Sequence, residues 1–121
     1  MATYKESGVD IDVANAGLKR IKKHVSKTFN NCTLSNIGSF GGCFSLPKDE
    51  YSNPVLVSSV DGVGTKLLIA SLSNKHDTIG QCLVNHCTND ILAIGAKPLF
   101  FLDYFAAGRL DQDIFHSVVK G

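Results

Sequence analysis

Asp90 is the acidic residue whose position most needs a chemical explanation. On a helical wheel it lies between Ile79, Leu83, Cys87 and Ile94, near the middle of an apolar face. A carboxylate on such a face is driven to take up a proton unless a cation or hydrogen-bond donors keep it ionised. A bound metal ion is one such cation. The structural alternatives are a shorter helix, or a carboxylate that bonds to neighbouring backbone.

A glycine-rich segment supplies the second group of candidates. It runs Asp61-Gly62-Val63-Gly64-Thr65-Lys66 directly after an apolar stretch. Glycines let backbone N–H groups approach an anion, Thr65 offers a hydroxyl and Lys66 offers a positive charge. Asp61, at the end of a predicted strand, is placed to hold Mg²⁺ on a phosphate. The spacing is not that of a Walker A loop, and a simple turn is the alternative interpretation.

Three further features each have a functional and a structural interpretation. Lys22 flanks the apolar stripe of a predicted helix. It is either a functional cation or a side chain whose stem simply lies along the apolar surface. The run from Gly38 to Gly42 is either an anion-binding nest or the tightly packed start of a strand. Asp103 shares a predicted strand face with Phe101 and Phe105. It is either a hydrogen-bonded structural carboxylate or a residue that contacts a ligand.

Composition excludes several classes of protein. Apolar residues make up 44% of the 121 residues and charged residues 19%, as in an ordinary globular domain. A net charge of +1 predicts neither nucleic acid nor a membrane surface as a partner, and we interpret the basic cluster between Lys19 and Lys27 as a solvated helix face. The polar start and the short apolar runs predict a cytoplasmic protein with four reduced cysteines. We interpret Cys82 and Cys87 as small buried residues, and His86 between them as a surface or satisfied histidine.

Helices and strands are expected to alternate around these residues. Asp10 is the expected cap of a helix that runs to about Thr28. A second helix is expected to start near Thr78, capped by Asp77 or Thr78, and to stop at Gly95. A third follows the cap Asp111. Strands are predicted in the later part of 37–47, over Val55–Val60 and over Leu99–Phe105.

The sequence therefore predicts an α/β fold in which a mixed sheet is flanked by helices. Three strands leave an edge of the sheet uncovered, and the last helix has no continuation. We expect residues 1–121 to be an incomplete amino-terminal domain.

Six ordered motifs resemble the AIR synthetase family of cyclo-ligases, and together they cover essentially the whole chain. The first two, Tyr4 to Asp12 and Ile37 to Pro47, are similar to the family's Y-x-x-A-G-V-D-I opening and its I-G-G-F-G-G segment. The other four match the family in order and spacing: Asp61 to Leu67, His76 to Gly80, Cys87 to Ile91 and Gly95 to Tyr104. Ser7, Ser39 and Val60 replace the family's usual alanine, glycine and threonine, and Val60 removes one hydroxyl near the glycine loop.

The resemblance implies an enzyme that uses ATP and Mg²⁺ to convert formylglycinamidine ribonucleotide into aminoimidazole ribonucleotide, ADP and phosphate. By position, Asp61 and Asp90 would hold the metal and the ATP phosphates. Gly62, Val63, Gly64, Thr65 and Lys66 would wrap the nucleotide. Lys22 would neutralise charge on the transferring group.

The resemblance also implies a larger assembly. Family members are nearly three times as long, with a second α/β domain, and the sheets of two copies join into a barrel in a homodimer. Two alternatives stay open. One is another ATP-using member of the superfamily, such as a selenophosphate synthetase or a thiamine-monophosphate kinase. The other is a non-catalytic dimerisation piece, and we expect the 121 residues alone to be inactive.

Overall fold

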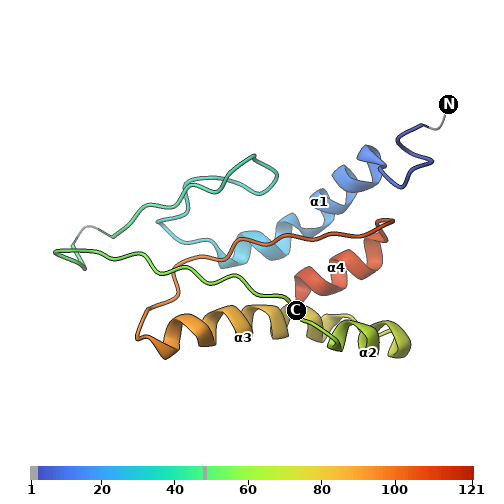
Figure 1. Ribbon diagram of the computed structural model, residues 1–121. Coiled ribbons are helices and arrows are strands. Elements are labelled where there is room, and N and C mark those ends of the chain that lie inside the picture. The colour runs from blue at the N-terminus through green and yellow to red at the C-terminus, as the bar shows by residue number, and fades with distance from the viewer. Residues whose placement is uncertain (1–2, 48) are drawn as a thin grey trace.

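The computed structural model describes residues 3–47 and 49–121, and over these residues helices alternate with long extended segments (Figure 1). The helical elements are α1 (Ile11–Val25), the 3₁₀ turn η1 (Ser26–Thr28), α2 (Lys66–Ser73), α3 (Asp77–Ala93) and α4 (Gln112–Lys120).

Two of the predicted helix caps are confirmed. The Asp10 carboxylate accepts hydrogen bonds from the backbone N–H groups of Asp12 and Val13, each at 3.1 Å, and so starts α1. Asp111 starts α4 in the same way. Each cap satisfies N–H groups that have no partner within the helix. The same backbone hydrogen bonds hold the pKa values of Asp10 and Asp111 below their usual range.

The start of α3 differs from the prediction, whereas its end agrees. The capping position is His76, which makes no side-chain cap, and Asp77 is already the first helical residue. At the other end the N–H of Ala96 donates to the carbonyl of Ile91, which closes the helix around Gly95 as expected. α2 was not predicted, because an eight-residue helix this rich in apolar side chains has no clear helical periodicity.

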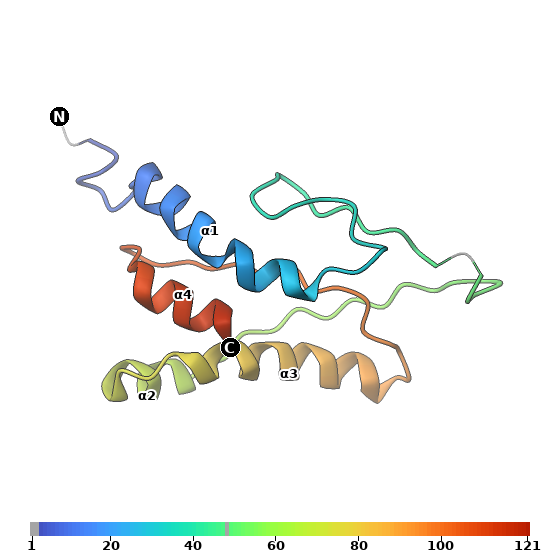
Figure 2. The same ribbon diagram turned by 180° about the vertical axis from the view of Figure 1, so that it is seen from behind.

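The helices form three successive layers, with α4 between α1 and α3 (Figures 1 and 2). A side chain at Gly80 of α3 would place its Cβ 2.1 Å from the carbonyl oxygen of Val118 in α4, so only glycine allows this approach. On the other side of α4, the ring of Phe115 lies against Gly17 of α1. A close backbone approach on one side and the ring of Phe115 on the other therefore fix α4 between its neighbours.

The predicted mixed sheet is not confirmed in the described residues. In the described residues the only β pairing is an isolated antiparallel bridge between Thr33 and Phe44. The segments Val55–Val60 and Leu99–Phe105 are extended, but no backbone hydrogen bond joins them within the described chain. A strand requires a partner at hydrogen-bonding distance, and the single chain does not bring one alongside either segment.

The chain leaves much apolar surface uncovered. Its buried apolar residues are Ile21, Ala70, Ile79 and Cys87, whereas Val60 is 96% exposed and Leu72 89%. The surface area is 9532 Å² for 13.0 kDa, against about 6,300 Å² for a compact monomer of this mass. The excess of roughly 3,200 Å² shows that the chain is packed less compactly than a globular monomer of the same mass.

Candidate functional site

The glycine-rich segment forms a loop between an extended segment and α2. Gly64 has a φ of +73°, a left-handed conformation that glycine adopts without strain, and it lies two residues before the first residue of α2. Thr65 occupies the capping position of α2, and its side chain makes no capping hydrogen bond. The Asp61 carboxylate accepts from the N–H of Gly62 at 2.7 Å. The loop therefore presents glycine backbone, a hydroxyl and a carboxylate at the start of a helix, where anions are favoured.

This loop and the segment before it lie along one side of α3. Ser59 donates to Asp90, with Oγ 2.8 Å from Oδ2. Asp61 lies beside His86, with Oδ2 3.6 Å from Nδ1. Lys66 donates to Cys82, with Nζ 2.7 Å from Sγ. As the residue number rises along the loop, its partner's number falls along α3, so the two run antiparallel.

The repeat distances of strand and helix explain this register. The α3 partners Cys82, His86 and Asp90 are four residues apart and form one stripe of the helix. Four helical residues rise about 6 Å, and two extended residues about 6.6 Å. Ser59 and Asp61 therefore meet successive turns of α3, and Val60 between them points away and is almost fully exposed. Asp61 and Asp90 consequently lie about one helical turn apart along α3.

Asp90 is not in the apolar environment that its sequence position suggests. Its side chain is exposed, and so is Ile94 beyond it, whereas Ile79 and Cys87 earlier in α3 are buried. In the described chain α4 approaches α3 beside Gly80, near the start of that helix. The expectation of an inward-facing Asp90 is therefore wrong for this chain, and desolvation no longer argues for a bound cation there.

The carboxylates of Asp61 and Asp90 suit a metal ion that is bound mainly by other ligands. The described residues contain no group of three or more His, Cys, Asp or Glu side chains able to hold a metal ion. Mg²⁺ at a nucleotide is commonly held by one or two carboxylates together with phosphate oxygens and water. Asp61 and Asp90 supply two carboxylates beside a glycine loop, so their chemistry suits Mg²⁺ carried on phosphates.

The contact between Asp61 and His86 is weak. The two side chains are 50% and 45% exposed, and ion pairs in contact with water contribute about 0–1 kcal/mol. Sequence reasoning treated His86 as a surface residue and did not single out Ser59. The signal that identifies both is the match of an i, i+2 spacing in the extended segment with an i, i+4 spacing in α3.

The other candidates lie apart from this stripe. Lys22 is exposed on α1, and α4 lies between α1 and α3, so no contact among the described residues joins Lys22 to the loop. Removal of surrounding water raises the pKa of Asp103, and the N–H of Tyr104 partly opposes that rise. Gly38 to Gly42 form the exposed tip of the turn that is closed by the Thr33–Phe44 bridge.

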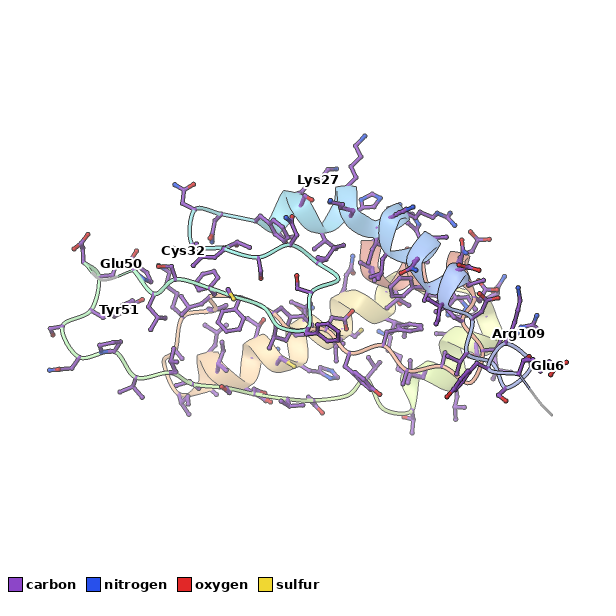
Figure 3. The ribbon with its side chains drawn as sticks, turned by 90° about the horizontal axis from the view of Figure 1, so that it is seen from above. Glu6, Lys27, Cys32, Glu50, Tyr51 and Arg109 are labelled. Carbon is purple, nitrogen blue, oxygen red and sulfur yellow. The ribbon has the colours of Figure 1, made fainter. Side chains whose placement is uncertain are left out.

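A hollow of about 340 Å³ lies near the amino-terminal end of α1, away from the loop. Its lining includes Lys5, Glu6, Asp10 and Arg109, and Figure 3 shows Glu6 and Arg109 at one end of the molecule. Lys5 pairs with Asp10 at 3.1 Å. Because the hollow's charges are of both signs and no loop residue lines it, we do not assign the nucleotide to it.

Two other predictions concern membranes and thiols. Within residues 3–47 and 49–121, no helix combines the length and the apolar character needed to cross a bilayer. All four cysteines are free thiols, and Cys87 alone among them is buried. Cys82 is only partly buried and contacts Lys66, so the interpretation of it as a small core residue is wrong.

Comparison with known proteins identifies the family. Residues 38–121 match the family described as AIR synthase related protein, N-terminal domain. The phosphoribosylformylglycinamidine cyclo-ligase of Trichlorobacter lovleyi is 54% identical over 99% of this chain and 34% of its own length. The enzyme of the same name from Geotalea uraniireducens is 56% identical over 98% of this chain and 34% of its own length. That from Clostridium botulinum (strain Okra / Type B1) is 54% identical over 100% of this chain and 36% of its own length. The chain spans about a third of the length of these curated relatives, and it belongs to the family of AIR synthase related proteins.

Proposed function

We propose that the chain is the nucleotide-binding part of an ATP-dependent cyclo-ligase that converts formylglycinamidine ribonucleotide into aminoimidazole ribonucleotide, ADP and phosphate, a step of purine biosynthesis. The observation that carries the proposal is the antiparallel register of the glycine loop on α3, which sets Asp61 and Asp90 on one side of that helix. The identity to relatives named as cyclo-ligases favours this activity over that of a selenophosphate synthetase or a thiamine-monophosphate kinase.

Each residue of the loop has a role in this proposal. The backbone of Gly62, Val63 and Gly64 approaches the phosphates, and the uncommitted hydroxyl of Thr65 donates to them. Lys66 exchanges its hydrogen bond with Cys82 for a phosphate oxygen. Asp61 and Asp90 hold the Mg²⁺ that accompanies ATP, and the ion, when bound, offsets the negative charge that develops on the transferring phosphoryl group.

The proposed role of Lys22 has less support than the roles of the loop residues. Its role as the cation that neutralises charge on the transferring group is supported by the family resemblance alone, because in the described chain α4 lies between α1 and α3, the helix that the loop contacts. A lysine that acts on the reacting group must reach it at hydrogen-bond distance. If Lys22 has this role, the complete enzyme brings α1 and the nucleotide together through contacts that a single 121-residue chain does not make.

A second candidate function is dimerisation, favoured by the excess of apolar surface. Val55–Val60 and Leu99–Phe105 carry many exposed apolar side chains and no ladder partner in the described chain. We propose that these segments pair with a second copy and complete a sheet across a homodimer. The two functions are compatible, and we expect the isolated 121 residues to associate without closing the ring.

The test compares Asp61→Asn and Asp90→Asn with the unaltered complete protein. Mutations of groups that only support a metal ligand cost about 10–100-fold in metal affinity, so loss of a direct ligand is expected to cost at least about 100-fold in Mg-ATP affinity and in ring closure. Calorimetric titration with Mg-ATP measures affinity, and a thermal melt checks that the variants fold. Unchanged Mg-ATP affinity in a folded Asp90→Asn protein removes Asp90 from the site.

A further inference from the structure

Ser59 is the point at which the extended segment before the glycine loop rests on α3. Among residues 51–60, all of which the structure describes, Ser59 is the one whose side chain is not exposed. Its hydroxyl lies 2.8 Å from Oδ2 of Asp90, a distance typical of a hydroxyl that donates to a carboxylate. Ser58 and Val60 on either side are exposed. The contact is therefore specific to one residue of the segment.

The chemistry of this contact suits a carboxylate that has a second task. A serine hydroxyl donates a single hydrogen bond and carries no charge. It occupies one lone pair of Oδ2 and leaves Oδ1 of Asp90 with its accepting capacity. A lysine or arginine in the same place would instead neutralise the carboxylate and weaken its attraction for a cation. The hydroxyl thus orients Asp90 and leaves its negative charge in place.

An exposed aspartate needs such support. Its χ2 torsion is broad, so an unsupported exposed carboxylate samples many orientations. Carboxylates that bind metal ions are themselves held by hydrogen bonds from neighbouring groups, and those groups influence metal affinity. In α3 the described partner of the Asp90 carboxylate is Ser59, which comes from a segment 31 residues earlier in the chain.

We propose that Ser59 is a positioning residue for Asp90: its hydroxyl fixes the carboxylate so that Oδ1 faces the same cation as the carboxylate of Asp61, two residues further along the segment. The proposal rests on the function proposed above, since it requires Asp90 to bind the cation of Mg-ATP. It goes beyond that function because Ser59 itself touches neither metal nor nucleotide.

The test uses four single variants of the complete protein and the double variant that combines Ser59→Ala with Asp90→Asn. Ser59→Ala removes the donor, Ser59→Thr keeps a hydroxyl, and Ser58→Ala is the matched control on the neighbouring exposed residue. Asp90→Asn reports on the proposed site itself. Mg-ATP affinity is measured by calorimetry at several Mg²⁺ concentrations, beside a thermal melt of each variant. If Ser59→Ala does not fold, Ser59→Cys replaces it, because a thiol is close in size and only a weak donor.

We expect Ser59→Ala to weaken Mg-ATP binding by about tenfold and to raise the Mg²⁺ concentration needed for half-saturation. Ser59→Thr is expected to keep most of the Mg-ATP affinity of the unaltered protein, and Ser58→Ala is expected to leave that affinity unchanged. In an Asp90→Asn background, Ser59→Ala is expected to have no further effect, because a positioning residue acts only through the residue that it positions.

The failures of the two proposals are distinguishable. If Asp90→Asn leaves Mg-ATP affinity unchanged, the proposed site is wrong and the role of Ser59 with it. If Asp90→Asn weakens binding but Ser59→Ala behaves like Ser58→Ala, only the inference about Ser59 is overturned. If Ser59→Ala costs as much in the Asp90→Asn background as alone, the hydroxyl acts directly on the ligand and the positioning role is overturned.

Discussion

His86 of α3 lies with its Nδ1 3.6 Å from Oδ2 of Asp61, one helical turn from the contact between Ser59 and Asp90. The loop aspartate thus has an imidazole neighbour, whereas the second aspartate accepts a hydrogen bond from a hydroxyl. The two carboxylates of the proposed Mg-ATP site are consequently held by different chemistry, and mutations of their neighbours should have different effects.

His86→Gln is expected to change Mg-ATP affinity by less than about fivefold. The pair with Asp61 is half exposed, and such pairs are worth about 0–1 kcal/mol. Calorimetric titration beside Asp61→Asn measures the difference between the neighbour and the carboxylate itself. A loss as large as that of Asp61→Asn would show that His86 contacts the nucleotide directly.

Gly80→Ala is expected to destabilise the fold. Alanine is normally better than glycine in a helix by about 1 kcal/mol. Here the added Cβ would lie 2.1 Å from the carbonyl oxygen of Val118, and overpacking of this kind costs roughly 1–3 kcal/mol or more, so the clash decides the sign. Chemical denaturation measures the loss.

Gly41→Ala is the matched control for Gly80→Ala. No atom lies within 4 Å of the Cβ that it would add, and Gly41 does not have a positive φ. We expect a change within about 0.5 kcal/mol. A Gly80→Ala protein as stable as the Gly41→Ala protein would contradict the close approach of α3 and α4.

Acid is expected to weaken the packing of α1 on α4 through His24. Its ring lies 5.1 Å from that of His116, centroid to centroid. Burial lowers the pKa of His24 below 6.5, and so do the neighbouring His116, Lys27, Lys120 and Lys23. A histidine whose pKa is lower in the folded state contributes stability above its unfolded value, and that stability is lost as the pH falls below about 6.5.

Replacement of His24 by glutamine should therefore flatten the decline of the melting temperature between pH 7.5 and pH 5. His116→Gln removes one of the groups that lower the pKa of His24 and should act in the same direction. Because the two rings interact, the double variant is expected to gain less than the sum of the single variants. An equally steep decline in His24→Gln would rule out this histidine as a source of acid sensitivity.

The 121-residue chain is expected to form dimers through its extended segments. Leu102 is 70% exposed in Leu99–Phe105, and a charge placed there would have to be buried on pairing. Leu102→Glu should thus yield monomer by light scattering at concentrations where the unaltered chain is dimeric. Leu72→Glu, on the outer side of α2, is the control and should leave the dimer intact. A monomeric unaltered chain at high concentration would contradict the proposed dimerisation.

Local sequence signals predicted α1, α3 and α4 and the caps of α1 and α4, but not α2. The carboxylates of Asp10 and Asp111 bond to N–H groups two and three residues ahead, so such caps can be recognised from neighbouring residues alone. The same signals misjudged the burial of Asp90, because a helical wheel identifies the apolar side of α3 but not how far another helix covers it.

The amino-acid order alone indicated the family, the helices α1, α3 and α4, the caps Asp10 and Asp111, and the glycine loop between Asp61 and Lys66, because each depends on residue types close together in the chain. The tertiary structure decided which partners those residues have. Ser59 meets Asp90 across 31 positions and Asp61 meets His86 across 25, through an antiparallel register of an extended segment on a helix. Extended segments also become strands only when a partner lies at hydrogen-bonding distance, and a single copy of the chain does not place one beside Val55–Val60.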